Sequence, residues 1–128
     1  MILLDTHAWI WWASQSPKLS AAAQQALANE PAVGVAAISC WEVAMLVDKG
    51  RLKLDRDVGL WVDQAAALPK VVVLALTPQI AVASVRLPPG FHGDPADRMI
   101  VATARQHSVP VLTKDDRIQK SGLVATIW

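Results

Sequence analysis

The chain has 128 residues, which is the commonest size of a single domain and enough to bury a core without disulfides. Apolar residues make up 53% of the composition and charged residues 18%, which excludes a disordered chain. The net charge of +1 by itself argues neither for nor against a polyanionic partner such as nucleic acid. No apolar stretch reaches the roughly 18 residues that span a bilayer, and no basic leader precedes the first apolar run, so we expect neither a membrane span nor a secretion signal. Cys40 is the only cysteine, which excludes an internal disulfide and makes a reducing cytoplasm the expected compartment. We expect one domain over residues 1–128.

Apolar runs of strand length alternate with helical patterns along the chain. In chain order, we expect a strand at 1–5, helices at 7–14 and 20–30, a strand at 32–38, helices at 39–49 and 57–68, a strand at 71–76, helices at 77–87 and 94–104, and strands at 109–113 and 123–128. Residues 88–93 are expected to form a surface loop, and a short helical turn is expected between the last two strands.

Several helix starts carry recognisable caps. Ser20 is an expected N-cap, and Asp94 is another, followed by a proline at the first helical position. Ser39 and Glu42 have the spacing of a capping box, which predicts that a helix begins there. Gly50 is well placed to end that helix.

The strands are near-continuous apolar runs separated by helices, which is typical of a parallel sheet covered on both faces. We therefore predict an α/β fold, a three-layer α/β/α sandwich around a mostly parallel central sheet of four to five strands, with the last strand at an edge. Ligands of such sheets bind outside the carboxyl ends of the strands, where the following helices begin. Right-handed crossovers bring these positions to one edge.

Acidic residues stand at this edge in several places. Asp5 ends the first strand, and Glu42 lies in the first turn of the helix after the second strand. Asp97 lies in the first turn of the helix before the fourth strand, with Asp94 at its cap, and Asp115 follows that strand. Each acid alone has a simpler interpretation as a helix cap or as a partner of the helix dipole. The hypothesis of a site therefore depends on several of these acids lying at the same edge of the sheet.

Carboxylates that are held close together repel one another, and a divalent cation relieves the repulsion. Mg²⁺ and Mn²⁺ prefer oxygen ligands and can activate water against a phosphodiester. The chain has no glycine-rich phosphate loop, no zinc-binding Cys/His spacing and no recognisable Ser-His-Asp order. Setting aside four of the 11 acidic residues as a site leaves 7 against 12 basic residues, which suits a polyanionic substrate.

Four stretches give the sequence a family resemblance. They are Asp5-Thr6 after the first strand, Glu42 at the start of a helix, the run DRMIVATA from Asp97, and the run LTKD that ends at Asp115. With these motifs the chain resembles a PIN domain, specifically the VapC-type toxins of bacterial toxin-antitoxin pairs, over nearly its whole length. The resemblance implies an endoribonuclease that cleaves RNA phosphodiesters with water activated by Mg²⁺ or Mn²⁺. It also implies a homodimer or higher homo-oligomer and inhibition by a small cognate antitoxin protein.

The resemblance also assigns residues to the site. The family's catalytic and metal-binding acids correspond to Asp5, Glu42, Asp97 and Asp115. Two neighbouring acids remain open as further metal ligands, namely Asp94 and Asp116. Supporting roles are expected for Thr6, Thr113 and Arg98, the last of which would touch RNA phosphate or brace a carboxylate.

Three basic residues are candidates for binding the substrate: Lys49, Arg51 and His92. Two other classes of function stay open at this point. Receiver-like signalling domains also collect acids at this edge of a parallel sheet, with a nearby Thr and Lys that Thr113 and Lys114 would match. A catalytically silent PIN-fold binding protein is the other alternative.

Overall fold

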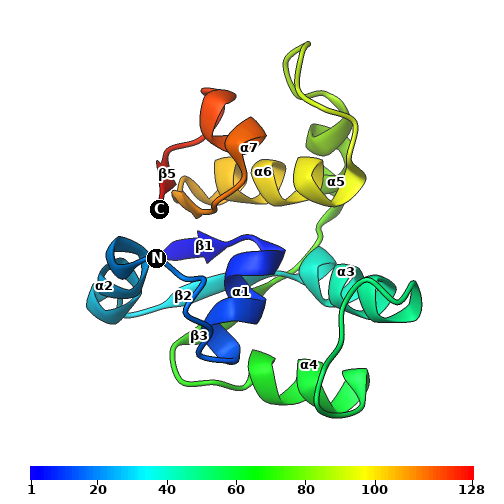
Figure 1. Ribbon diagram of the computed structural model, residues 1–128. Helices are drawn as coiled ribbons and strands as arrows, with labels where there is room; N and C mark the ends of the chain where they lie inside the picture. Colours follow the sequence, from blue (N-terminus) through cyan, green and yellow to red (C-terminus); the bar gives the residue numbers. More distant parts are fainter.

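Five parallel strands form one central sheet in the computed structural model, which describes residues 1–128 (Figure 1). The strands are β1 (Ile2–Leu4), β2 (Val33–Ala36), β3 (Val71–Leu74), β4 (Val111–Leu112) and β5 (Thr126–Ile127). Their order in the sheet is β3-β2-β1-β4-β5, and every neighbouring pair is parallel. The predicted parallel sheet is confirmed, and β5 lies at an edge as expected.

Seven helices connect the strands. They are α1 (Thr6–Ala13), α2 (Ala21–Asn29), α3 (Ala37–Asp48), α4 (Val58–Ala66), α5 (Pro78–Val85), α6 (Pro95–His107) and α7 (Asp116–Lys120). The side chains of Ser20 and Asp94 cap α2 and α6 as predicted. No helix combines the length and the apolar character that crossing a bilayer requires.

The helices cover both faces of the sheet, which gives the predicted three-layer α/β/α sandwich (Figure 1). One face packs against α1, α2 and α4 around the fully buried ring of Trp9, which meets Trp61 of α4 edge-on. The other face packs against α6 through Leu3, Ile100 and Val111. Successive residues of β1 therefore point into different cores, because side chains alternate between the faces of a strand.

The predicted capping box at Ser39 and Glu42 is wrong. The last residue of β2, Ala36, is followed directly by the first residue of α3, so the helix begins two residues before Ser39. No side chain caps α3, and Ser39 lies buried inside it, where its hydroxyl meets that of Thr6. Gly50 follows the end of α3 as expected, with a φ of +68°, which glycine adopts without strain.

The pairing of β1 with β4 places the ends of these two central strands side by side. Leu4 is opposite Leu112 in the register, so the next residues, Asp5 and Thr113, emerge together at the carboxyl edge of the sheet. The starts of α3, α6 and α7 must bring their side chains to this same edge if the predicted site is to form.

Candidate active site

Five carboxylates line one cavity of about 410 Å³ at the carboxyl edge of the sheet. They belong to Asp5, Glu42, Asp94, Asp97 and Asp115. The structure thus brings together all four acids of the predicted set, from the end of β1, from α3, from the start of α6 and from the cap of α7. Asp94, a further candidate ligand, joins them.

Asp5 is the most deeply placed of these acids, with only 7% of its surface exposed. One carboxylate oxygen accepts a hydrogen bond of 2.8 Å from the backbone N–H of Ala8 and so caps α1, while the other accepts from the hydroxyl of Thr113. Burial raises the pKa of Asp5, and the negative charge of Asp97 adds to the rise. The bonds from Thr113 and Ala8 act in the opposite sense, so the carboxylate is held firmly in an environment that penalises its charge.

Glu42 lies half-buried on α3 and accepts a hydrogen bond from the hydroxyl of Thr6. Thr6 is buried, and its oxygen lies 3.0 Å from the hydroxyl of Ser39. Burial raises the pKa of Glu42, and the charges of Asp97 and Asp94 raise it further. The predicted supporting hydroxyls, Thr6 and Thr113, therefore each donate to one acid of the set.

Asp97 lies near the start of α6 with 15% of its side chain exposed. Its carboxylate is 2.7 Å from Nε2 of His92 and 3.6 Å from the guanidinium of Arg117. Burial raises the pKa of Asp97 even though the bond with His92 opposes the rise, and the charges of Asp94 and Asp115 raise it further. His92, a candidate substrate contact, thus lies against an acid of the site.

Asp115 caps α7 through its carboxylate, and its own N–H donates to the oxygen of Thr113 at 2.9 Å. Arg117 holds this carboxylate with an Nη2 contact of 3.1 Å. Burial alone would raise the pKa of Asp115, but the hydrogen bonds and charge of Arg117 outweigh it and hold the pKa below its ordinary value. Asp115 is therefore the one acid of the four that already has a cationic partner strong enough to favour its charged form.

Arg117 is a site residue that sequence reasoning missed. It contacts both Asp97 and Asp115 and lines the acidic cavity. Its position two residues after Asp115 was a usable signal, because the first residues of a capped helix lie close to the capping carboxylate. Lys114 and His7 also line the cavity without having been singled out for the site.

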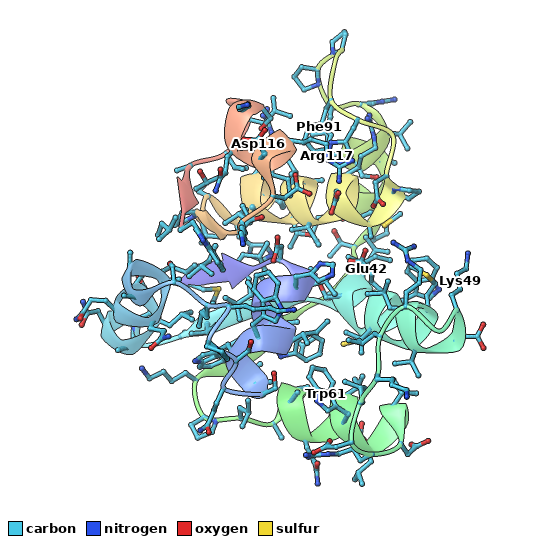
Figure 2. The ribbon with its side chains drawn as sticks, in the orientation of Figure 1. Glu42, Lys49, Trp61, Phe91, Asp116 and Arg117 are labelled. Atoms are coloured by element: carbon cyan, nitrogen blue, oxygen red, sulfur yellow. The ribbon has the colours of Figure 1, made fainter.

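Three of the predicted site residues lie outside the acidic cavity. Asp116 does not line the acidic cavity, because its carboxylate is directed to Lys120 one turn along α7, at 2.9 Å. Arg98 neither braces a carboxylate nor faces the cavity, since its guanidinium donates to backbone carbonyls at the end of α5 and in the following loop, including those of Ser84 and His92. Lys49 lies exposed beyond the end of α3, away from Glu42 (Figure 2). Of the two predicted basic contacts near α3, Arg51 alone lines the cavity.

The donor set of the acidic cavity fits a hard divalent cation, because it consists of carboxylate oxygens, the ligands that Mg²⁺ and Mn²⁺ prefer. No three His, Cys, Asp or Glu side chains are already arranged around a single point as metal ligands. The hydrogen bonds explain this arrangement: each acid of the set of four is turned toward a donor of the protein, namely Thr113, Thr6, His92 or Arg117.

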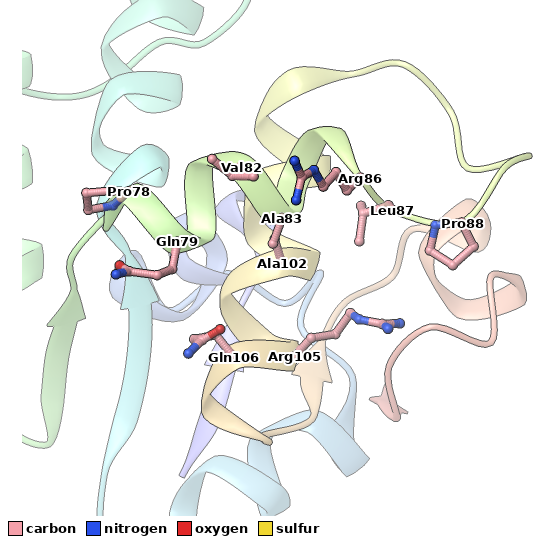
Figure 3. A pocket seen from close by; sticks show the side chains of 10 residues that line it. All are labelled: Pro78, Gln79, Val82, Ala83, Arg86, Leu87, Pro88, Ala102, Arg105 and Gln106. Atoms are coloured by element: carbon pink, nitrogen blue, oxygen red, sulfur yellow. The ribbon is translucent and has the colours of Figure 1, made fainter.

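The largest cavity, of about 670 Å³, lies elsewhere, between α5 and α6 (Figure 3). Its lining includes Val82, Arg86 and Arg105 but no carboxylate. This cavity has neither the carboxylates nor the buried hydroxyls that are found at the acidic cavity. The smaller, acidic cavity is therefore the candidate active site.

Comparison with known proteins agrees with this fold. The PIN domain family matches residues 2–122, and the chain therefore belongs to the PIN-domain family. The chain is 40% identical to Ribonuclease VapC22 of Mycobacterium tuberculosis, over 99% of this chain and 98% of that protein.

Solved structures with low sequence identity share the fold. A toxin-antitoxin complex from Klebsiella pneumoniae contains a chain with a TM-score of 0.69 and 22% identity, which covers 98% of this chain and 97% of that one. VapBC2 from Rickettsia felis, bound to a DNA fragment from its promoter, gives a TM-score of 0.72 at 14% identity with the same coverage. At this level of identity, these likenesses establish the architecture alone.

Proposed function

We propose that this PIN-domain protein is a metal-dependent endoribonuclease and the toxin of a toxin-antitoxin pair. The observation that carries the proposal is the convergence of five carboxylates from distant parts of the chain in one cavity. The 40% identity with a protein named Ribonuclease VapC22, over nearly the full length of both chains, supports RNA as the substrate class. Residues 1–128 would act as a single PIN domain.

Asp5, Glu42 and Asp97 are the residues that would hold the cation, with Asp115 as a further ligand or as an acceptor for water. Bound Mg²⁺ or Mn²⁺ would supply charge for the phosphodiester and lower the pKa of water. Burial and mutual repulsion raise the pKa of Asp5 and of Asp97, which supports a site that is completed by positive charge.

The hydroxyls of Thr113 and Thr6 would orient the two acids that they contact. Each donates to a carboxylate oxygen, so the acid keeps one direction in the cavity while its remaining lone pairs stay free for the cation. A ligand that is held by its neighbours in this way loses little conformational freedom when the cation binds.

The direct test is cleavage of a panel of structured and single-stranded RNAs with Mg²⁺ or Mn²⁺, with and without a chelator. We expect cleavage that the chelator stops and that Asp5→Asn abolishes, while the far-ultraviolet circular dichroism of the variant stays that of the parent. Asp48→Asn is the matched control, because Asp48 is an exposed acid at the end of α3. Parental cleavage by Asp5→Asn would contradict the assignment.

A small antitoxin protein is the proposed partner. The K. pneumoniae and R. felis structures are toxin-antitoxin and VapBC complexes, which supports an antitoxin for this chain. The cytoplasm, which holds RNA and keeps the single Cys40 reduced, is the proposed compartment. Co-expression with the neighbouring open reading frame and co-purification of its product would test the partner.

A second copy of the chain is the other proposed partner, through exposed valines of β3 and α5. β3 is an edge strand whose Val72 and Val73 are 41% and 45% exposed, and α5 exposes Val82 and Val85 by 50% and 77%. Unpaired strand edges and exposed valines favour association. Light scattering should give the mass of a dimer for the parent and of a monomer for Val85→Lys, whereas a dimer in both would place the interface elsewhere.

A further inference from the structure

A second cavity, of about 440 Å³, lies next to the acidic cavity and has a different character. One wall is the loop of residues 88–92 and the other is α7 with the turn that follows it. Arg117 lines both cavities, and His92, which lines the second, touches Asp97 of the first at 2.7 Å. The two cavities therefore share Arg117 and adjoin each other where His92 contacts Asp97.

The cationic side chains of this second cavity are Arg117 and Lys120, and the imidazole of His92 lies beside them. The guanidinium side chain of Arg117 is 60% exposed in spite of its contacts with two acids, so it is open to a further anion. Asp116 is the only acid in the lining, and its contact with Lys120 joins two side chains that are 68% and 76% exposed. Surface pairs of this kind are worth little, so Lys120 is available to a phosphate.

The cavity also contains the only phenylalanine of the chain. The rings of Phe91 and His92 lie with their centroids 4.3 Å apart and tilted by 40°, and both are half-buried. Figure 2 shows Phe91 and Arg117 close to each other beside α7. An aromatic face next to cationic groups is the combination that binds single-stranded nucleic acid, because the base stacks while the phosphate is neutralised.

The loop that carries Phe91 is held in place before any ligand binds. Arg98 donates to the carbonyls of both Phe91 and His92, at 3.2 Å each, and its guanidinium lies 6.0 Å from the centre of the Phe91 ring. Pro88 and Pro89 restrict the backbone shortly before Phe91 in the chain. An aromatic platform that is already ordered loses little entropy on binding.

We propose that this second cavity is the subsite for an RNA nucleotide that flanks the scissile phosphate. The base stacks on Phe91, and the phosphate lies between Arg117 and Lys120. The proposal rests on the proposed ribonuclease function, since the scissile phosphate must lie in the acidic cavity. In this proposal, Phe91, Lys120 and Arg117 position the substrate. The carboxylates of the acidic cavity cannot do this by themselves.

Binding of a fluorescein-labelled single-stranded RNA to the Asp5→Asn protein, followed by anisotropy in the presence of Mg²⁺, tests the subsite without turnover. Phe91→Leu in that background should weaken binding by about tenfold, since stacking on an aromatic ring is worth roughly 1–3 kcal/mol per base. Phe91→Trp should keep the parental affinity. Lys120→Gln should lower the slope of log K against log salt by about 0.7, the value for one phosphate contact in a single strand.

Lys53→Gln is the matched control, because Lys53 is exposed and lines neither cavity. Lys120 is itself on the surface, so its variant stays informative even if Phe91→Leu is poorly folded. Parental affinity and salt slope in both Phe91→Leu and Lys120→Gln would overturn the subsite. The subsite is also wrong if these variants lose binding to a protein partner while their RNA binding is unchanged. The cavity would then be part of the interface with that protein.

The failure of the subsite is distinct from the failure of the proposed function. If the unmodified protein cleaves RNA and the Phe91 and Lys120 variants bind RNA as their parent does, the subsite alone is wrong. If the unmodified protein cleaves no RNA with either metal, the ribonuclease function is wrong, and the subsite falls with it.

Discussion

The hydroxyl of Thr113 donates a hydrogen bond to the carboxylate of Asp5, although the two residues are 108 positions apart in the sequence. The contact exists because β1 and β4 are neighbours in the sheet and end in register. The same oxygen of Thr113 accepts the N–H of Asp115, so one buried side chain links two acids of the proposed site. The geometry of the acidic cavity is therefore tied directly to the pairing of the two central strands.

Replacing Thr113 with valine keeps the shape of the side chain but removes this hydroxyl. The buried carboxylate of Asp5 loses a donor, and the N–H of Asp115 loses an acceptor, so we expect a loss of about 2 kcal/mol in the free energy of unfolding. Urea denaturation followed by tryptophan fluorescence measures it. Thr113→Ser keeps the hydroxyl and should lose clearly less, and parental stability in Thr113→Val would show that the hydroxyl contacts do not stabilise the fold.

The stability of the metal-free protein should fall as the pH rises. Asp5, Glu42 and Asp97 have raised pKa values, chiefly through burial, so the folded chain retains protons that the unfolded chain has released. The stability they contribute is fully present below the ordinary carboxyl pKa of about 4 and is lost as the pH rises through the raised values. Asp115 has a lowered pKa and acts in the opposite sense.

This pH dependence can be measured as the urea midpoint between about pH 4 and about pH 8, in the presence of a chelator. Asp97→Asn removes one of the three raised carboxyls and should flatten the fall in stability across this range. A fall of the same size in Asp97→Asn and in the parent would remove Asp97 as a source of the effect.

Mg²⁺ or Mn²⁺ should raise the melting temperature, because a cation that binds only the folded protein stabilises it, by about 2.7 kcal/mol when its concentration is 100 times the dissociation constant. The rise should be larger at about pH 8 than at about pH 5, since protonated carboxyls bind metal poorly. Differential scanning fluorimetry with and without chelator measures both effects. Asp5→Asn should lose most of the shift, and an undiminished shift would mean that the cation binds elsewhere.

Arg98 should matter for stability and not for the electrostatics of the site. Its guanidinium donates to backbone carbonyls on two segments, which ties the loop of residues 88–93 to the end of α5. Lysine lacks the planar set of donors, so Arg98→Lys should lower the free energy of unfolding by about 2 kcal/mol and expose the loop to proteases. Arg86→Lys, on the exposed end of α5, is the control. Equal rates of proteolysis in the two variants would argue against this role.

The sequence was sufficient to predict the fold because its signals are local. Apolar runs such as the one that forms β2, and caps such as Ser20 and Asp94, act within a few residues, and the sheet and the helices follow from them. The predicted strand at 32–38 was too long, because residues 37 and 38 already belong to α3. The capping box failed for the same reason: Ser39 and Glu42 fit the local pattern, but both side chains contact Thr6, more than 30 residues away. A rule based on residue spacing cannot predict a contact with a residue far away in the sequence.

The candidate acids could also be placed from the sequence, because the ends of parallel strands and the starts of the following helices meet at one edge of the sheet. Which charges these acids meet was not predictable. Arg117 reaches Asp97 across two helices, and Arg98 turns away from the site to the carbonyls of a loop.

By itself, then, the sequence determined the layered parallel fold and the convergence of Asp5, Glu42, Asp97 and Asp115 on one edge, because backbone periodicity and strand direction fix both. Only the tertiary structure decided the partner of each carboxylate and opened a second cavity beside Phe91. Those features depend on the direction of side chains from distant segments, within distances of a few ångströms that no pattern along the chain encodes.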